Sequence, residues 1–149
     1  MKKHCIQNAP PSMLINELSK LFNDRMRQKT ERMGMAEGQR RMLFHLSHNE
    51  QLTQLELVKR SHLSAPTVSV ALQKMEAEGL VTRTCNVHDQ RAVLVQLTEA
   101  GKAADRKVVC AIHETEKELL QGISEEKIAT LRLILEQMYH NLEKEVRPQ

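Results

Sequence analysis

The sequence predicts a mainly α fold with one small β-hairpin, and three observations support this fold class. Apolar residues recur at helical spacing over most of the 149 residues. Two short β-branched runs, at 80–85 and 93–97, flank a polar segment and are typical of a hairpin. Residues 53–79, directly before them, show the pattern of helix, short turn and helix. Because so small a hairpin needs helices beneath it, we expect a winged helix-turn-helix.

Composition limits the class of protein. The chain is 40% hydrophobic and 28% charged, which is typical of a folded globular protein. No apolar run approaches the ~20 residues that span a bilayer, and the start MKKHCIQNAPPS lacks the apolar stretch of a secretory signal. Three cysteines without CxxC spacing argue against a disulfide framework or a structural zinc site. We therefore expect a cytoplasmic protein with no membrane contact and no cofactor.

Two helices are expected before the helix-turn-helix. Ser12 follows two prolines and can cap a first helix that runs to about Arg32, where Gly34 breaks the chain. A second helix is expected from about Ala36 to Ser47. Their apolar positions are Leu14, Leu18, Leu21, Phe22 and Met26 in the first helix and Met42, Leu43 and Leu46 in the second.

Capping signals define the helix-turn-helix. Thr53 and Glu56 form a capping box, with Leu52 and Leu57 at the hydrophobic-staple positions. The residues Ser61-His62-Leu63-Ser64 interrupt this helix, and Ser64 caps the next one, which ends at Gly79. The inner face of that second helix is expected to consist of Val68, Ala71, Leu72 and Met75.

Two helices are expected after the hairpin. Thr98 caps a helix to about Leu120, Gly122 breaks the chain, and Ser124 caps a last helix. This last helix has a 3-4-3-4 apolar repeat, which predicts a helix-to-helix assembly surface. The alternative is that the repeat packs on its own chain. Its residues are Ile128, Leu131, Leu135, Met138 and Leu142.

The second helix of the helix-turn-helix has an outward face suited to a DNA major groove, because its residues are small or hydrogen-bonding. Thr67, Ser69 and Gln73 can bond base edges, whereas Lys74 suits phosphate. The alternative is an ordinary solvated polar face. The full outward set, with the cap, is Ser64, Ala65, Pro66, Thr67, Ser69, Val70, Gln73 and Lys74.

Charge is unevenly placed along the chain, whose net charge is +3. From Lys20 to Arg41 there are seven Lys/Arg against three Asp/Glu, whereas residues 99–145 have seven against ten. A basic N-terminal region and an acidic C-terminal region fit a protein that presents one surface to a polyanion.

Several segments resemble the MarR family of bacterial transcription regulators over nearly the whole length. They are residues 52–57 (LTQLEL), residues 69–83, the triplet Asp89-Gln90-Arg91, and Leu97-Thr98-Glu99-Ala100-Gly101. The Asp-x-Arg followed by Leu-Thr-x-x-Gly is the specific combination. The resemblance implies a homodimer whose first and last helices interlock, with two winged domains on one pseudopalindromic DNA site.

The resemblance also implies roles for single residues. In the family, the helix that matches Ser64–Glu78 reads the major groove, and the wing reaches the minor groove. Arg91 is then expected to contact DNA, and Asp89 is expected to hold the Arg91 side chain in place. Many relatives have a second basic residue where this chain has Gln90, so we expect a smaller electrostatic contribution from this wing.

These inferences divide the chain into three parts. Residues 1–34 are expected to form a tail and a dimerisation helix, 35–98 the winged helix-turn-helix, and 99–149 further dimerisation helices. Leu14 and Leu18 join the apolar repeat of the last helix at the dimer interface. We expect a repressor, not an enzyme, that binds double-stranded DNA as a homodimer and is released by a small organic effector.

Other interpretations of the polar and sulfur-containing residues remain open. His88-Asp89 is a weak candidate dyad, because neighbouring strand side chains point apart. A metal site is conceivable at His45 and His48 with His113-Glu114, although zinc-responsive relatives have their ligands near Arg40 and Arg41.

The effector and the trigger for release also remain open. An oxidant would need a reactive thiol at Cys5, Cys85 or Cys110. An organic effector would use a pocket near Met26, Met42 and Phe44, although methionines are more often core. A non-DNA alternative is a helical module that binds another protein through its last helix.

Overall fold

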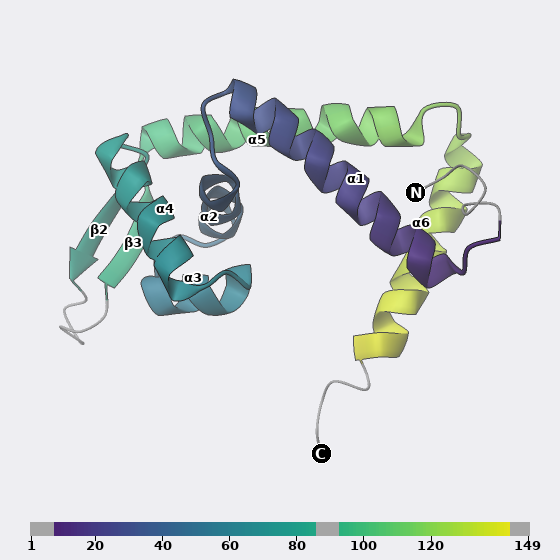
Figure 1. The fold of residues 1–149 in the computed structure, drawn as a ribbon, viewed down its shortest axis with the longest axis horizontal. Helices are drawn as coiled ribbons and strands as arrows, with labels where there is room; N and C mark the ends of the chain where they lie inside the picture. The colour runs from purple at the N-terminus through teal and green to yellow at the C-terminus, as the bar shows by residue number, and fades with distance from the viewer. Residues whose placement is uncertain (1–7, 86–92, 144–149) are drawn as a thin grey trace, which may run out of the picture. The chain divides into compact units, whose positions relative to one another are not determined.

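The computed structural model describes residues 8–85 and 93–143. In this part of the chain the fold is mainly helical with a small antiparallel sheet, as the sequence predicts (Figure 1). The chain divides into two compact units between Thr115 and Glu116. The elements are α1 (Pro11–Arg32), α2 (Glu37–Ser47), β1 (Leu52–Thr53), α3 (Gln54–Ser61), α4 (Ala65–Ala77), β2 (Val81–Cys85), β3 (Val93–Leu97), α5 (Glu99–Leu120) and α6 (Glu125–Glu143).

Helix α1 begins two residues before the expected start. Pro10 occupies the N-cap position without a side-chain cap, and Pro11 is the first helical residue. A proline suits the first helical position because an N–H there would have no hydrogen-bond partner within the helix, so its absence costs nothing. The cap predicted at Ser12 is therefore wrong. The helix ends as predicted, with Gly34 at φ +75°.

Helices α2, α3 and α4 gather with the sheet into one lobe of the first unit (Figure 1). The inward faces predicted for α2 and α4 are confirmed, since Met42, Leu43, Val68, Leu72 and Met75 have no exposed surface. Burial of such side chains contributes roughly 1.5–3 kcal/mol each. Further core residues are Met26, Met35, Leu46, Leu52, Leu57, Ala71, Val81, Val95, Leu97, Val108 and Ala111.

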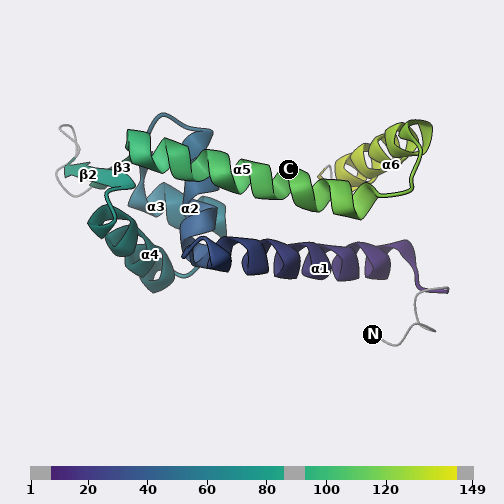
Figure 2. The ribbon, with the colours of Figure 1, turned by 90° about the horizontal axis from the view of Figure 1, so that it is seen from above.

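The end of α1 lies beside α5 within the first unit (Figure 2). The Thr115 hydroxyl lies 3.5 Å from the Met26 sulfur, and Lys29 forms a 3.3 Å ion pair with Glu114. Met26 and Thr115 are both buried. These contacts join the second half of α1 to α5.

The sheet has three strands in the order β1-β3-β2, one more than predicted. Strands β2 and β3 form the predicted hairpin, with Val81 opposite Leu97 and Cys85 opposite Val93. The added strand β1 pairs Leu52 with Val95 and Thr53 with Leu94. Thr53 is therefore both a strand residue and the N-cap of α3. Because its capping pattern already indicates a helix start, the sequence gives no separate indication of this two-residue strand.

The Leu-Thr-x-x-Gly motif has a packing explanation at the start of α5. The Thr98 hydroxyl accepts from the Gly101 N–H at 3.0 Å and donates to the Gly79 carbonyl at 2.6 Å. A Cβ on Gly101 would lie 2.0 Å from the Leu80 carbonyl oxygen. Only glycine permits this approach, so the motif fastens α5 to the turn after α4.

The second unit contains the end of α5 and helix α6. Gly122 has φ +79°, and the Ser124 carbonyl accepts from the Ile128 N–H at 3.0 Å, so α6 starts where expected. No residue of α6 is buried. None of the helices in the described ranges is both long and apolar enough to span a membrane.

Candidate nucleic-acid interface

The turn between α3 and α4 is fixed by side chains from two helices. His62 has left-handed backbone with φ 55°. The buried Ser61 accepts from the Leu63 N–H at 3.3 Å through its hydroxyl. Arg41 on α2 donates from Nη1 to the Ser61 carbonyl at 3.2 Å. These bonds connect α2 to the turn that precedes α4.

The N-terminal end of α4 is open to solvent and contains no acidic residue in its first turn. Ser64 caps the helix by accepting from the Thr67 N–H at 3.3 Å, and the two hydroxyls lie 2.7 Å apart. The positive end of a helix dipole without nearby carboxylates favours an approaching phosphate.

The outward face of α4 lies where the sequence places it. Val70 is 65% exposed, Ser69 is half-buried, and the other predicted positions are exposed. The Lys74 ammonium lies 3.7 Å from Glu78, an i,i+4 pair on the exposed surface. This face therefore offers hydroxyl, amide and methyl groups, together with one partly neutralised cation. The exposed positions are Ser64, Ala65, Pro66, Thr67, Val70, Gln73 and Lys74.

The residues predicted to form the wing tip, Asp89, Gln90 and Arg91, lie outside the described residues. The strands that lead into and out of this segment are described. Strands β2 and β3 pair along their full lengths, from Val81–Leu97 to Cys85–Val93.

An ion pair that the sequence analysis missed joins β2 to α4. Arg83 donates from Nε to Glu76 Oε2 at 2.8 Å, and its Nη2 contacts the same oxygen. This hydrogen bond holds the pKa of Glu76 below its usual value, against a smaller opposing effect of desolvation. The two residues lie seven positions apart, on different elements, so no helical or strand spacing indicates their contact.

A cavity of about 410 Å³ lies among α1, α2, α3 and α5 in the first unit. Phe44, predicted to line an effector pocket, is on its wall, whereas Met26 and Met42 have no exposed surface and belong to the core. The wall is rich in cations and imidazoles. Its residues are Phe22, Asn23, Arg40, Arg41, Phe44, His45, Arg60, Ser61, His62, Val108 and Ile112.

Arg40 on this wall has one unsatisfied polar atom. Its Nε is buried and has no hydrogen-bond partner within the described residues. Burial lowers the pKa of Arg40, with Glu37 opposing. Burial also lowers the pKa of His45, and the neighbouring Arg60 adds to this effect. An anionic group in the cavity would relieve both unfavourable effects.

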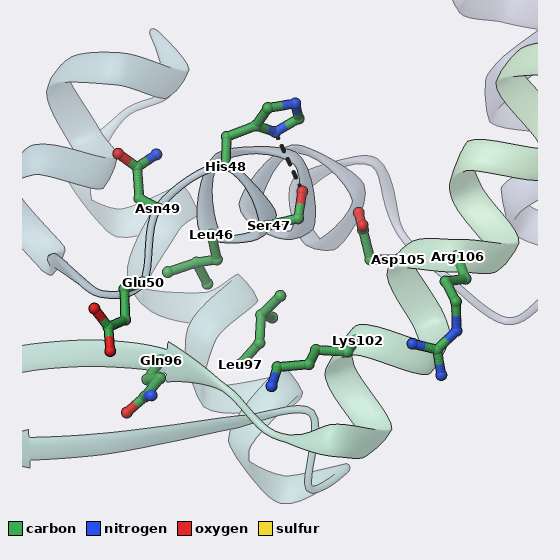
Figure 3. A pocket seen from close by; sticks show the side chains of 10 residues that line it. All are labelled: Leu46, Ser47, His48, Asn49, Glu50, Gln96, Leu97, Lys102, Asp105 and Arg106. Carbon is green, nitrogen blue, oxygen red and sulfur yellow. Dashed lines mark hydrogen bonds between the residues drawn. The ribbon is translucent and has the colours of Figure 1, made fainter.

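A second cavity, of about 530 Å³, lies between the end of α2, β3 and the start of α5 (Figure 3). Ser47, His48 and Asp105 line it, residue types that also form nucleophilic sites. However, the Phe44 carbonyl lies 2.7 Å from His48 Nδ1, and the Ser47 hydroxyl lies 3.2 Å from the same nitrogen. Because a carbonyl only accepts, Nδ1 must carry a proton, so it is no base for Ser47.

Asp105 in this second cavity is not placed as the orienting carboxylate of a nucleophilic triad. Burial raises the pKa of its carboxyl, while a hydrogen bond with Ser47 opposes that rise. The carboxylate thus faces the hydroxyl, whereas in a nucleophilic triad it would orient the imidazole.

The described histidines, acids and cysteines bear on the open alternatives of metal and redox chemistry. No group of three or more His, Cys, Asp or Glu side chains there is arranged to hold a metal ion. Cys85 and Cys110 are exposed free thiols, and Cys5 lies outside the described residues.

The residues predicted for dimerisation present apolar surface in both units. In the first unit Leu14 is half-buried and Leu18 is 49% exposed. In the second unit a groove of about 820 Å³ is lined by the end of α5 and one side of α6. On α6, Ile128 and Met138 are half-buried, and Leu131, Leu135 and Leu142 are exposed.

Comparison with known proteins agrees with this architecture. A sequence model described as MarR family matches residues 33–92. Wild-type apo MarR from E. coli has a TM-score of 0.81 at 22% identity, over 87% of this chain and 96% of that one. A MarR transcriptional regulator from Methanosarcina mazei gives 0.77 at 26% identity, over 89% and 96%.

A third structure is a mutant of S. aureus MepR bound to an oligodeoxyribonucleotide. Its TM-score is 0.62 at 27% identity, over 89% of this chain and 98% of that one. The matched segment 33–92 contains the described helix-turn-helix, and the structural similarity covers most of each chain. Residues 33–92 match the MarR family model, and over most of its length the chain has the fold of MarR-family winged helix-turn-helix structures.

Proposed function

We propose that the chain is a cytoplasmic repressor that binds a pseudopalindromic site on double-stranded DNA as a homodimer. The observation that carries this proposal is the outward face of α4, which has an acid-free first turn and exposed hydroxyl, amide and methyl groups. The DNA-bound MepR mutant, a structural relative, adds support. DNA binding is assigned to residues 35–98, and dimerisation to residues 1–34 and 99–149.

In this proposal α4 enters the major groove and reads bases directly. Gln73 is exposed on the outward face and has the donor and acceptor that match the edge of adenine. Ser69 and Thr67 contact bases nearer the start of the helix, and Val70 packs on a thymine methyl. Lys74 contacts phosphate and contributes affinity without sequence preference.

The wing is proposed to add a minor-groove contact through Arg91, with Asp89 as its support. Gln90 between them removes one positive charge that many relatives have. The described base of the wing is consistent with a fixed hairpin, because β3 pairs with strands on both sides.

The homodimer is proposed to form through the exposed apolar residues of α1 and α6. A surface with several large exposed apolar side chains marks an interaction site in most proteins. The 3-4-3-4 spacing on α6 fits a second helix of the same kind. The residues assigned to this interface are Leu14, Leu18, Ile128, Leu131, Leu135, Met138 and Leu142.

The effector is proposed to occupy the cavity beside Phe44. Three arginines on its wall favour an anionic group, and Phe22, Val108 and Ile112 favour an apolar body. A ligand that binds better to the DNA-incompetent arrangement of the dimer would release it by population shift.

The test is selection of bound duplexes from a random library, followed by titration of the selected duplex at several salt concentrations. The proposal expects a palindromic consensus and binding that weakens as salt rises. Absence of any duplex binding at low salt would refute DNA binding and favour a protein-binding module instead.

A further inference from the structure

Gln39, in the first turn of α2, is a buried polar side chain with both ends of its amide engaged. It is 1% exposed. Its Oε1 accepts from the Ala36 N–H at 3.0 Å, and its Nε2 donates to Glu78 Oε2 at 2.7 Å. Ala36 belongs to the connector between α1 and α2, and Glu78 is the residue that ends α4. One side chain thus joins the connector, α2 and α4.

The two partners fix the orientation of the Gln39 amide. The Ala36 N–H can only donate, and the Glu78 carboxylate can only accept. Neither a hydrophobic residue nor a second carboxylate at position 39 would satisfy both partners. The bond to Glu78 involves a charged acceptor, which makes it stronger than a neutral hydrogen bond.

The C-terminal end of α4 is held from two sides, whereas its N-terminal end faces solvent. Gln39 holds Glu78 from α2, and Arg83 holds Glu76 from β2. The helix closes with Gly79 at φ +71° and a 2.8 Å bond from the Leu80 N–H to the Met75 carbonyl. Because a helix is rigid, a small rotation at this held end moves the exposed end that is proposed to read DNA.

Space for such a rotation is present beside the Gln39–Glu78 bond. A cavity of about 350 Å³ is lined by both residues and by parts of the connector, the turn after α4 and α5. Its other residues are Met33, Gly34, Met35, Leu80, Ala104 and Lys107.

We propose that Gln39 is a positioning residue for DNA recognition, which sets the orientation of α4 by holding Glu78 against the connector between α1 and α2. This inference rests on the DNA-binding function proposed above. It makes the connector, rather than the α4 surface alone, a determinant of base discrimination.

Three variants isolate the bond. Gln39→Glu keeps an acceptor for the Ala36 N–H but loses the donor and places a carboxylate opposite Glu78. Glu78→Gln keeps an acceptor for Gln39 but also removes the i,i+4 ion pair with Lys74, so this second single variant measures the effect of losing that pair. In the double variant Gln39→Glu/Glu78→Gln, the new amide at position 78 donates to the new carboxylate at position 39, so the bond is restored with reversed polarity. Gln28→Glu, exposed on α1, controls for the added negative charge.

The first readout compares the duplex selected by the wild-type chain with a scrambled duplex. We expect Gln39→Glu to bind the selected duplex about tenfold more weakly and the scrambled duplex within about twofold. The double variant should recover the ratio of the two affinities to within about threefold of the wild-type ratio, because the loss of the Lys74 ion pair affects both duplexes alike. Equal losses on the two duplexes, unchanged binding by Gln39→Glu, or no recovery in the double variant would overturn the proposal.

The second readout needs no DNA. In hydrogen exchange on the full chain, Gln39→Glu should speed exchange of the Glu78, Gly79 and Leu80 amides, and the double variant should reverse this. Unchanged exchange would overturn the positioning role whatever the DNA results. If the variants show the expected exchange but the wild-type chain binds no duplex, the positioning role stands and the proposed DNA-binding function is contradicted.

Discussion

Arg83 on β2 holds the carboxylate of Glu76 on α4, with 2.8 Å between Nε and Oε2. This contact attaches the base of the wing to the helix that presents the candidate DNA-reading face. The two candidate DNA-contacting elements therefore share one fixed junction, and a change at either residue is expected to affect both.

The Arg83–Glu76 pair makes stability depend on pH in a defined direction. The folded-state pKa of Glu76 lies below the usual value of 4.5, so the stabilisation is present above that value and is lost as pH falls through the lowered pKa. We expect Arg83→Met to be less stable than the wild type at neutral pH, and this difference to shrink at an acidic pH below the lowered pKa of Glu76. Urea unfolding at both pH values measures it. An equal difference at the two values would contradict an ionic contact.

Gln73 and Lys74 are neighbours with different expected roles. Gln73→Ala should change base preference at one operator position, at a cost of roughly 1–3 kcal/mol on the preferred base. Lys74→Gln should weaken binding to all duplexes and reduce the salt slope by about one. Titrations on single-base operator variants separate the two effects. A uniform loss across sequences for Gln73→Ala would contradict base readout.

Arg91 is expected to act on DNA and not on assembly. Arg91→Ala should weaken operator binding while the mass in light scattering stays that of the wild type. The reverse change at its neighbour, Gln90→Arg, should strengthen binding most at low salt, because it adds a cation to the wing. If Arg91→Ala leaves operator affinity unchanged, the role assigned to the wing is wrong.

Met42 and Phe44 lie two positions apart on α2 but face different surroundings. Met42 is fully buried and Phe44 is 51% exposed on the wall of a cavity. Met42→Ala should reduce the free energy of unfolding by roughly 2–5 kcal/mol, and Phe44→Ala by less than about half of that. Chemical denaturation measures both. A larger loss for Phe44→Ala would place that ring in the core and remove it from the proposed effector pocket.

Leu135 and Leu133 form a matched pair for the dimer interface. Leu135 belongs to the 3-4-3-4 repeat and is 44% exposed, whereas Leu133 lies off the repeat and is 67% exposed. Leu135→Glu should shift the light-scattering mass toward the monomer, because a carboxylate would be buried between helices. Leu133→Glu should leave the mass unchanged. The opposite result would mean that a different face of α6 assembles.

The features that were predictable from the sequence are those with a local cause. Thr53 and Ser64 cap their helices within three residues, and Gly34 and Gly79 end helices by their own backbone conformation. The inner face of α4 follows from its periodicity. Ser12 failed as a cap because the preceding proline also suits the first helical position.

The features that the sequence concealed are contacts between distant elements. Gln39 meets Glu78 across 39 positions, and β1 pairs with β3 across about 40. Both contacts depend on how the lobe packs, and the residue types at these positions do not indicate which distant residues they contact. The cavity near Phe44 was predicted only in part, because Met26 and Met42 turned inward to fill the core.

The salt dependence of binding to the selected duplex tests the central claim most directly. If the exposed face of α4 reads DNA with help from the wing, the logarithm of the binding constant falls linearly with the logarithm of salt concentration. The slope should flatten by about one for Lys74→Gln and again for Arg91→Ala. A wild-type chain that binds no duplex at low salt, or binds with a slope that neither variant changes, would contradict the account.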